Sequence, residues 1–148
     1  MVDFSNFGSL KIDGRTAKYE LVEMQETPIP WLIVRPIGAD NKPYLNALLR
    51  EFGGNQRQMQ RVAGTLNAEN IARNREINRR LFPEFVVTDW GGVKDKHGAE
   101  VPFSVEACRD LFAQLPGYMI DGVRAFCDDP SNFVAGGLSV DVEEVAGN

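Results

Sequence analysis

The first third of the chain is patterned as β structure. An Asp-Gly pair at positions 13–14, a sequence typical of a tight hairpin turn, separates residues 10–12 from residues 16–22. A further apolar run at 31–34 is bounded by prolines on both sides, which is typical of a short, buried strand. The pattern therefore predicts a β hairpin followed by a strand within residues 8–36.

Apolar residues recur at helical spacing from about residue 40 onward. Asp40 or Asn41 is placed to cap a helix, Pro43 falls in its first turn, and glycines at 53–54 stop it. We expect a helix over 40–53 that buries one apolar face. The residues of that face are Tyr44, Leu45, Leu48, Leu49 and Phe52.

The next segment, 55–82, is rich in Gln, Asn and Arg and has few helix breakers. It predicts one or two helices within 56–82. Their apolar positions are sparse: Met59, Val62, Leu66, Ile71, Ile77, Leu81 and Phe82. Because so polar a helix contributes little to a core, we expect it to be exposed to solvent or to face another subunit.

Residues 85–135 combine a hairpin with a helical unit. Residues 85–103 predict a small hairpin with its tip at 97–98, and residues 104–135 predict three short helices, the first capped by Ser104 and the last by Asp129. We expect six residues of this region to be mostly buried together: Trp90, Phe103, Leu111, Phe112, Val123 and Phe126.

The pattern ends after Phe133, and residues 136–148 are expected to form a flexible acidic tail. Within it Leu138, Val140 and Val142 alternate with polar residues, so the tail either adds a strand to a partner's sheet edge or remains disordered. Residues 1–135 are expected to form a single compact unit. Its fold class is α+β, with a β-rich N-terminal third followed by a mainly helical C-terminal half.

Charge is segregated along the 148 residues, whose net charge is −5. Residues 50–83 carry seven arginines and three glutamates (+4), whereas residues 84–148 carry four basic and twelve acidic side chains (−8). This polarity favours salt-sensitive self-association through 55–82, or contact with a charged partner; an uneven solvated surface is the alternative. The candidate partner-binding residues are Arg73, Arg75, Arg79, Arg80, Leu138, Val140 and Val142.

Catalytic and ligand-binding motifs are not found in the sequence. The single histidine, His97, falls in a predicted turn, and no second candidate base accompanies it. Cys108 and Cys127 lack the spacing of a metal site and are expected to be free, buried thiols. We find no phosphate-binding loop. The sequence therefore predicts a non-enzyme with no catalytic residue, metal or cofactor.

Two further classes of partner are disfavoured. The four arginines at 73–80 are placed to contact phosphates, but an acidic chain with a pI of about 4.9 and no aromatic residues among those arginines speaks against nucleic acid. No apolar run reaches the roughly 20 residues that span a bilayer, and no secretory signal is visible, so we expect an intracellular protein without a membrane partner.

Residues 86–133 resemble the tail assembly chaperones of long-tailed bacteriophages. The resemblance rests on an ordered set of motifs: a tryptophan–glycine turn at 87–93, an acidic-glycine hairpin tip at 95–98, a Pro-Phe-Ser helix start, and two short helices that end before Asn132-Phe133. Upstream, residues 34–36 and 41–45 are also similar to this family, so the resemblance covers most of residues 30–133.

The resemblance implies an assembly factor of the host cell cytoplasm. Such a protein binds the long tape-measure protein, keeps it soluble, is displaced by the tail tube protein and is absent from the mature virion. The alternative is a permanent virion component, such as a minor tail or connector protein. A nucleic-acid-binding regulator is the third hypothesis.

Overall fold

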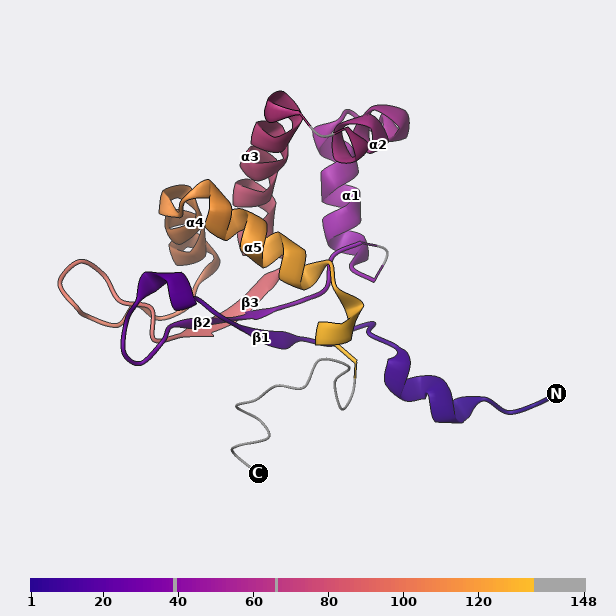
Figure 1. Cartoon of the computed structure of the whole chain (residues 1–148), viewed down its shortest axis with the longest axis horizontal. Helices are drawn as coiled ribbons and strands as arrows, with labels where there is room; N and C mark the ends of the chain where they lie inside the picture. Colours follow the sequence, from indigo (N-terminus) through magenta and orange to yellow (C-terminus); the bar gives the residue numbers. More distant parts are fainter. Residues whose placement is uncertain (39, 66, 135–148) are drawn as a thin grey trace.

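The computed structural model describes residues 1–38, 40–65 and 67–134. In this part of the chain, strands β1 (Ala17–Glu20), β2 (Trp31–Val34) and β3 (Val87–Gly91) form an antiparallel sheet in the order β1-β2-β3. The second half is mostly helical, with helices lying over one face of the sheet (Figure 1). The predicted α+β class is confirmed.

The central strand of the sheet is β2, and its apolar sequence suits a strand that is paired on both edges. Tyr19, Leu32 and Trp90 are register partners across the three strands, and Leu32 and Val34 are fully buried. Trp31 and Ile33 alternate with them and are only half-buried. This alternation assigns one face of the sheet to the helices, and within the described residues the other face carries no helical layer.

The predicted N-terminal hairpin, in which residues 10–12 pair with residues 16–22, is wrong. Ser5–Leu10 forms a 3-10 helix, and the turn at 13–14 is present, with the amide of Arg15 donating to the carbonyl of Ile12. Strand β1 then pairs with β2 rather than with residues 10–12. The physical reason is burial: residues 31–34 supply two fully buried apolar side chains to the core, whereas only Ile12 of residues 10–12 is buried.

Polar caps define the starts of the helices. The helices are α1 (Lys42–Glu51), α2 (Gln56–Gly64), α3 (Ala68–Phe85), α4 (Val105–Gln114) and α5 (Gly117–Cys127). Asn41, Asn55, Asn67 and Ser104 each accept a hydrogen bond from a backbone amide three residues on, at the first turns of α1 to α4. The expected caps at Asn41 and Ser104 are confirmed, as is Asp129 before the 3-10 turn Pro130–Asn132.

Helix α3 is the centre of the helical layer, contrary to our expectation that segment 56–82 contributes little to the core. It contacts α1, α2, α4, α5 and β3, and it buries Ile77, Leu81 and Phe82. Three apolar positions within six residues suffice because they form one seam along the helix, and neighbouring elements cover it from both sides. The expectation holds for α2, in which only Val62 is buried.

The region from β3 to α5 closes the core as predicted. Trp90, Phe112 and Val123 are buried, and Phe103, Leu111 and Phe126 are half-buried against them. The indole Nε1 of Trp90 donates to the carbonyl of Val101 (2.8 Å), and its ring meets Phe103 edge-on at 5.4 Å. This ties the hairpin to the start of α4.

The hairpin predicted over 85–103 is present at its tip only. The turn at 97–98 forms, with Lys94 bridged to Glu100 and Gly98 at a φ of +81°. Phe85 instead ends α3, and β3 pairs with the buried strand β2 and not with residues 100–103. The expectation for the two cysteines is confirmed. Cys108 and Cys127 are free thiols and both are buried.

Candidate functional site

The four arginines predicted to bind a partner all make contacts within the chain. Arg73 lies over the ring of Phe52 (4.5 Å), Arg75 pairs with Asp121 of α5, and Arg80 pairs with Glu51 of α1 at 2.6 Å. Arg79 donates to backbone carbonyls of α4. The arginines therefore point from α3 toward three different helices instead of forming one patch, and their role in partner binding stays a prediction.

Arg79 completes the C-terminus of α4. In a continuing helix the carbonyl of Phe112 would accept from the amide of residue 116, but that residue is Pro116 and has no N–H. The Nη1 atom of Arg79 donates instead to the carbonyls of Phe112 and Leu115, at 2.6 Å each. A positive charge at a helix C-terminus is also favoured by the helix dipole, so Arg79 stabilises the α4–α5 break.

Arg75 and Asp121 form a bidentate ion pair between α3 and α5. The Nε atom lies 3.0 Å from both carboxylate oxygens, and Nη2 lies 2.5 Å from Oδ2. The pair is partly solvated, with side-chain exposures of 38% and 46%, so solvent screening limits its contribution to stability. Gly117 makes room for it, because a Cβ there would lie 3.0 Å from the guanidinium carbon of Arg75.

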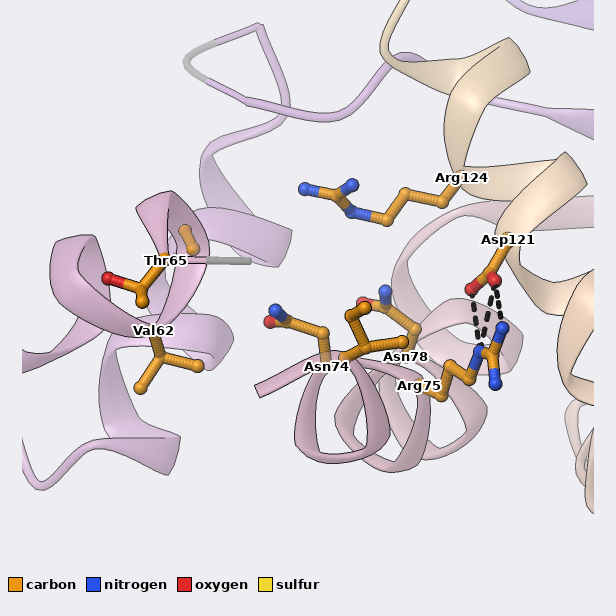
Figure 2. Close-up of a pocket in the computed structure, with 9 residues that line it drawn as sticks. Val62, Thr65, Asn74, Arg75, Asn78, Asp121 and Arg124 are labelled. Carbon is orange, nitrogen blue, oxygen red and sulfur yellow. Dashed lines mark hydrogen bonds and ion pairs between the residues drawn. The ribbon is translucent and has the colours of Figure 1, made fainter. Parts of the chain in front are cut away.

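Beside this ion pair lies a cavity of about 280 Å³ between α3, α5 and the end of α2 (Figure 2). Its walls are mainly polar: Thr65, Asn74, Asn78, Asp121 and Arg124 face it. Arg124 extends from α5 across the cavity toward α2, while Asn74 and Asn78 point up from α3. The cavity thus collects amide and guanidinium donors from two helices.

Asn78 forms the floor of this cavity and is held in a fixed orientation. Its side chain is buried (4% exposed), and its Oδ1 atom accepts from the hydroxyl of Tyr44 at 2.9 Å. Burial raises the pKa of Tyr44 to about 12, with Arg124 acting in the opposite direction, so the hydroxyl keeps its proton and donates. The Nδ2 donor of Asn78 is thereby turned toward the cavity.

Sequence analysis did not identify this cavity. Asn74 and Asn78 stand four residues apart on one helix, which is the one available signal for a shared polar face. Tyr44 of α1 is 34 residues from Asn78, and Asp121 of α5 is 46 residues from Arg75. These residues come together only because α1 and α5 both pack against α3.

A second feature lies at the N-terminus. Phe4, Phe7 and Leu10 are 53–63% exposed and stand three residues apart, which places them along one edge of the 3-10 helix Ser5–Leu10. The rings of Phe4 and Phe7 are 6.0 Å apart. No residue of this helix is buried, and it extends away from the sheet and the helical layer (Figure 1). We call Phe4, Phe7 and Leu10 the N-terminal ridge.

Neither a metal-binding cluster nor a membrane-spanning helix occurs in the part of the chain that the structure describes. No cluster of three His, Cys, Asp or Glu side chains suited to a metal ion occurs in residues 1–38, 40–65 and 67–134. His97 is exposed in its turn, where its amide donates to Asp95. None of the helices in those ranges combines the length and apolar character needed to cross a membrane. Leu138, Val140 and Val142 lie outside the described residues.

Comparison with known proteins decides the family. The family model of the YdaY prophage protein matches residues 39–143, more than half of the chain. The chain belongs to the YdaY prophage protein family. No curated protein and no solved structure matches it.

The YdaY match shows a phage-derived protein, which is a coarser statement than the tail assembly chaperone that the sequence motifs resemble. The matched residues contain α1 to α5, β3 and the whole cavity, and they continue through Leu138, Val140 and Val142. The N-terminal ridge and the strands β1 and β2 precede the match.

Proposed function

We propose that this YdaY-family protein is a non-enzymatic tail assembly chaperone. It binds the tape-measure protein in the host cell cytoplasm, keeps it soluble during tail assembly, yields to the tail tube protein and is absent from the mature virion. The prophage family supports the phage setting, and the motifs between residues 86 and 133 support the tail assembly role.

The observation that carries this proposal is the N-terminal ridge. Three large apolar side chains exposed together are unusual on a soluble domain and are typical of a surface that binds another protein. Met1 and Val2, at 124% and 69% exposure, extend the apolar surface. An amphipathic helix of a tape-measure protein offers the complementary apolar stripe, since such stripes repeat along a long helical partner.

The two thiols and the polar cavity favour a binding role over a catalytic one. The two nucleophilic thiols are buried, and burial raises the pKa of Cys108 and of Cys127 to about 12, so neither is a reactive thiolate at neutral pH. The cavity between α3 and α5 is polar and offers amide and guanidinium donors around an ion pair, without a histidine or thiol.

Self-association through residues 55–82 is part of the proposal. Since Arg73, Arg75, Arg79 and Arg80 have internal partners, the cations for an interface between copies are Arg57 and Arg61 of α2, which are exposed. The described residues provide no hydrogen bond or ion pair for the side chain of either arginine. Acidic residues of the C-terminal half of a second copy supply the opposite charge.

Co-expression with the tape-measure protein tests the function. The full chain should keep the tape-measure protein in the soluble fraction, whereas the triple variant Phe4→Ser, Phe7→Ser, Leu10→Ser should not. The matched control is Val22→Ser with Tyr118→Ser, which removes exposed apolar side chains elsewhere (56% and 61% exposed). A chain truncated after Ala135 tests the contribution of Leu138, Val140 and Val142.

Two results would overturn the proposal. The first is a tape-measure protein that stays insoluble in the presence of the intact chain. The second is stoichiometric retention of the chain in purified particles, which would establish the permanent virion component instead.

A further inference from the structure

Two hydrogen-bond donors of the cavity have no acceptor among the described residues. The side chain of Arg124 of α5 makes no hydrogen bond or ion pair there, although its guanidinium reaches into the cavity (Figure 2). The Nδ2 atom of Asn78 is the second donor, because the Tyr44 hydroxyl occupies Oδ1 of the same amide. No fully buried side-chain nitrogen or oxygen of the described residues lacks a hydrogen-bond partner, so the Nδ2 donor is accessible from the cavity and is not sealed inside the fold.

The carboxylate already at the cavity does not complete the arrangement. Asp121 lies three residues before Arg124 on α5, but both of its oxygens accept from Arg75. Asn74 adds another amide to the same wall, and Thr65 lines the cavity at the end of α2. The cavity therefore presents a guanidinium and an amide N–H that converge on one space, which is the donor set that carboxylate oxygens accept from.

We propose that this cavity is a binding site for a single carboxylate, the side chain of an aspartate or glutamate on a partner protein. One carboxylate oxygen accepts from the guanidinium of Arg124, and the other accepts from Nδ2 of Asn78. This site is separate from the N-terminal ridge and goes beyond the proposed chaperone function, because it specifies the chemistry of the partner whichever protein supplies it.

Size and charge favour a carboxylate over larger or more strongly charged anions. A volume of about 280 Å³ lies at the lower limit of pockets that enclose small-molecule ligands, roughly 300–1,000 Å³, and it suits one side chain. Arg75, Arg124 and Asp121 together carry a net charge of +1 at the cavity. This balances the single charge of one carboxylate but only half the charge of a phosphate dianion.

The site also has an entry that a side chain requires. The wall formed by α2 is held to the rest of the chain by little apolar packing, since only Val62 of that helix is buried. Thr65 follows α2 directly and is exposed. A partner's side chain therefore approaches between the end of α2 and Arg124, from the side that is open to solvent.

Nuclear magnetic resonance of the full-length protein tests the proposal. The probe is glutamate blocked at both its amino and carboxyl groups, so that the side chain is its one carboxylate; the matched probe is blocked glutamine. Titration with the glutamate probe should shift the side-chain amide signals of Asn78 and Asn74 and the Nε–H signal of Arg124 in a saturable way. The affinity for blocked glutamine should be lower by a factor of about ten or more.

Variants and competing ligands complete the design. Arg124→Gln should weaken binding of the glutamate probe about tenfold, and Arg124→Lys should retain part of it. Arg109→Gln is the matched control, since Arg109 pairs with Glu84 away from the cavity. This variant should bind the glutamate probe as tightly as the parent protein does. A peptide with one glutamate flanked by alanines should bind more tightly than the blocked amino acid, which identifies a protein side chain as the ligand.

Three outcomes would overturn the proposal: equal shifts with blocked glutamine, shifts confined to residues outside the cavity, or stronger binding of inorganic phosphate or a DNA oligonucleotide than of the glutamate probe. The chaperone function is tested separately by the solubility of the tape-measure protein, so each proposal can fail while the other holds.

Discussion

The hydroxyl of Tyr44 donates to Oδ1 of Asn78 at 2.9 Å, although both residues are only 4% exposed. The bond joins the first turn of α1 to the middle of α3, and a second bond from Nδ2 of Asn41, the N-cap of α1, to the carbonyl of Phe85 (2.9 Å) joins the same helix start to the end of α3. Two polar ties therefore fix the N-terminus of α1 against the central helix. One of them also orients the floor of the cavity.

Removing the hydroxyl should lower stability. In Tyr44→Phe the buried Oδ1 of Asn78 loses its donor, which should cost about 1–3 kcal/mol in the free energy of unfolding measured by urea denaturation. Tyr118→Phe is the matched control and should be neutral, because Tyr118 is 61% exposed. Equal stability of the two variants would mean that water replaces the Tyr44 hydroxyl.

Stability should fall at alkaline pH. Burial raises the pKa of Cys108 and Cys127 from 9.0 to about 12, and that of Tyr44 from 10.0 to about 12. The folded protein keeps these protons while the unfolded chain loses them, so the stabilisation is complete below pH 9 and declines as the pH rises to about 12. Each unit of pKa difference corresponds to about 1.4 kcal/mol.

Urea midpoints measured from neutral pH upward should therefore decrease once the pH passes 9. Cys108→Ala provides the control, since removing one thiol should make the decrease shallower whatever the variant's stability at neutral pH. A midpoint that stays constant up to pH 11 would show that these groups titrate normally in the folded state.

The apolar pattern of the sequence predicts much of the fold but little of the cavity. Helix α1, the caps at Asn41 and Ser104 and the core around Trp90 and Phe112 follow from local spacing and capping rules. The pairing of β1 does not, because the Asp-Gly signal describes a turn and says nothing of which strand lies beside residues 17–20. That choice depends on burial of the whole sheet.

Arg79 illustrates why the polar composition of segment 56–82 does not reveal its contribution to the core. Its guanidinium belongs to the interface with α4, but a sequence shows only a charged residue. Arg79→Met should lower the free energy of unfolding by about 1–3 kcal/mol, since two carbonyls at the end of α4 lose their donor. Arg61→Met, an exposed position on α2, should be close to neutral in the same denaturation assay.

Hydrogen exchange would locate the effect of Arg79→Met. The amides in the last turn of α4 and the first turn of α5 should lose protection, while those of α1 should not. Uniform loss of protection would point to global destabilisation without a special role at Pro116.

Gly91 is required because Trp31 lies against it. A Cβ at position 91 would stand 2.3 Å from Cζ2 of the indole, so Gly91→Ala should cost about 1–3 kcal/mol by overpacking. Gly64→Ala is the control, since no atom lies within 4 Å of a Cβ at that helical position. The double variant Gly91→Ala, Trp31→Val should recover part of the loss in thermal denaturation; no recovery would assign the cost to the backbone.

Deleting residues 1–10 should leave the fold intact while removing the N-terminal ridge. No residue of the 3-10 helix Ser5–Leu10 is buried, and Ile12 is the first core residue, at 8% exposure. The free energy of unfolding should therefore change by less than about 0.5 kcal/mol, as for other surface changes. Fluorescence of a dye that binds exposed apolar surface should fall, because Phe4, Phe7 and Leu10 are gone. A deletion through Ile12 should in contrast destabilise the domain. If the shorter deletion were as destabilising as the longer one, the ridge would be packing against its own domain and would not be available to a partner.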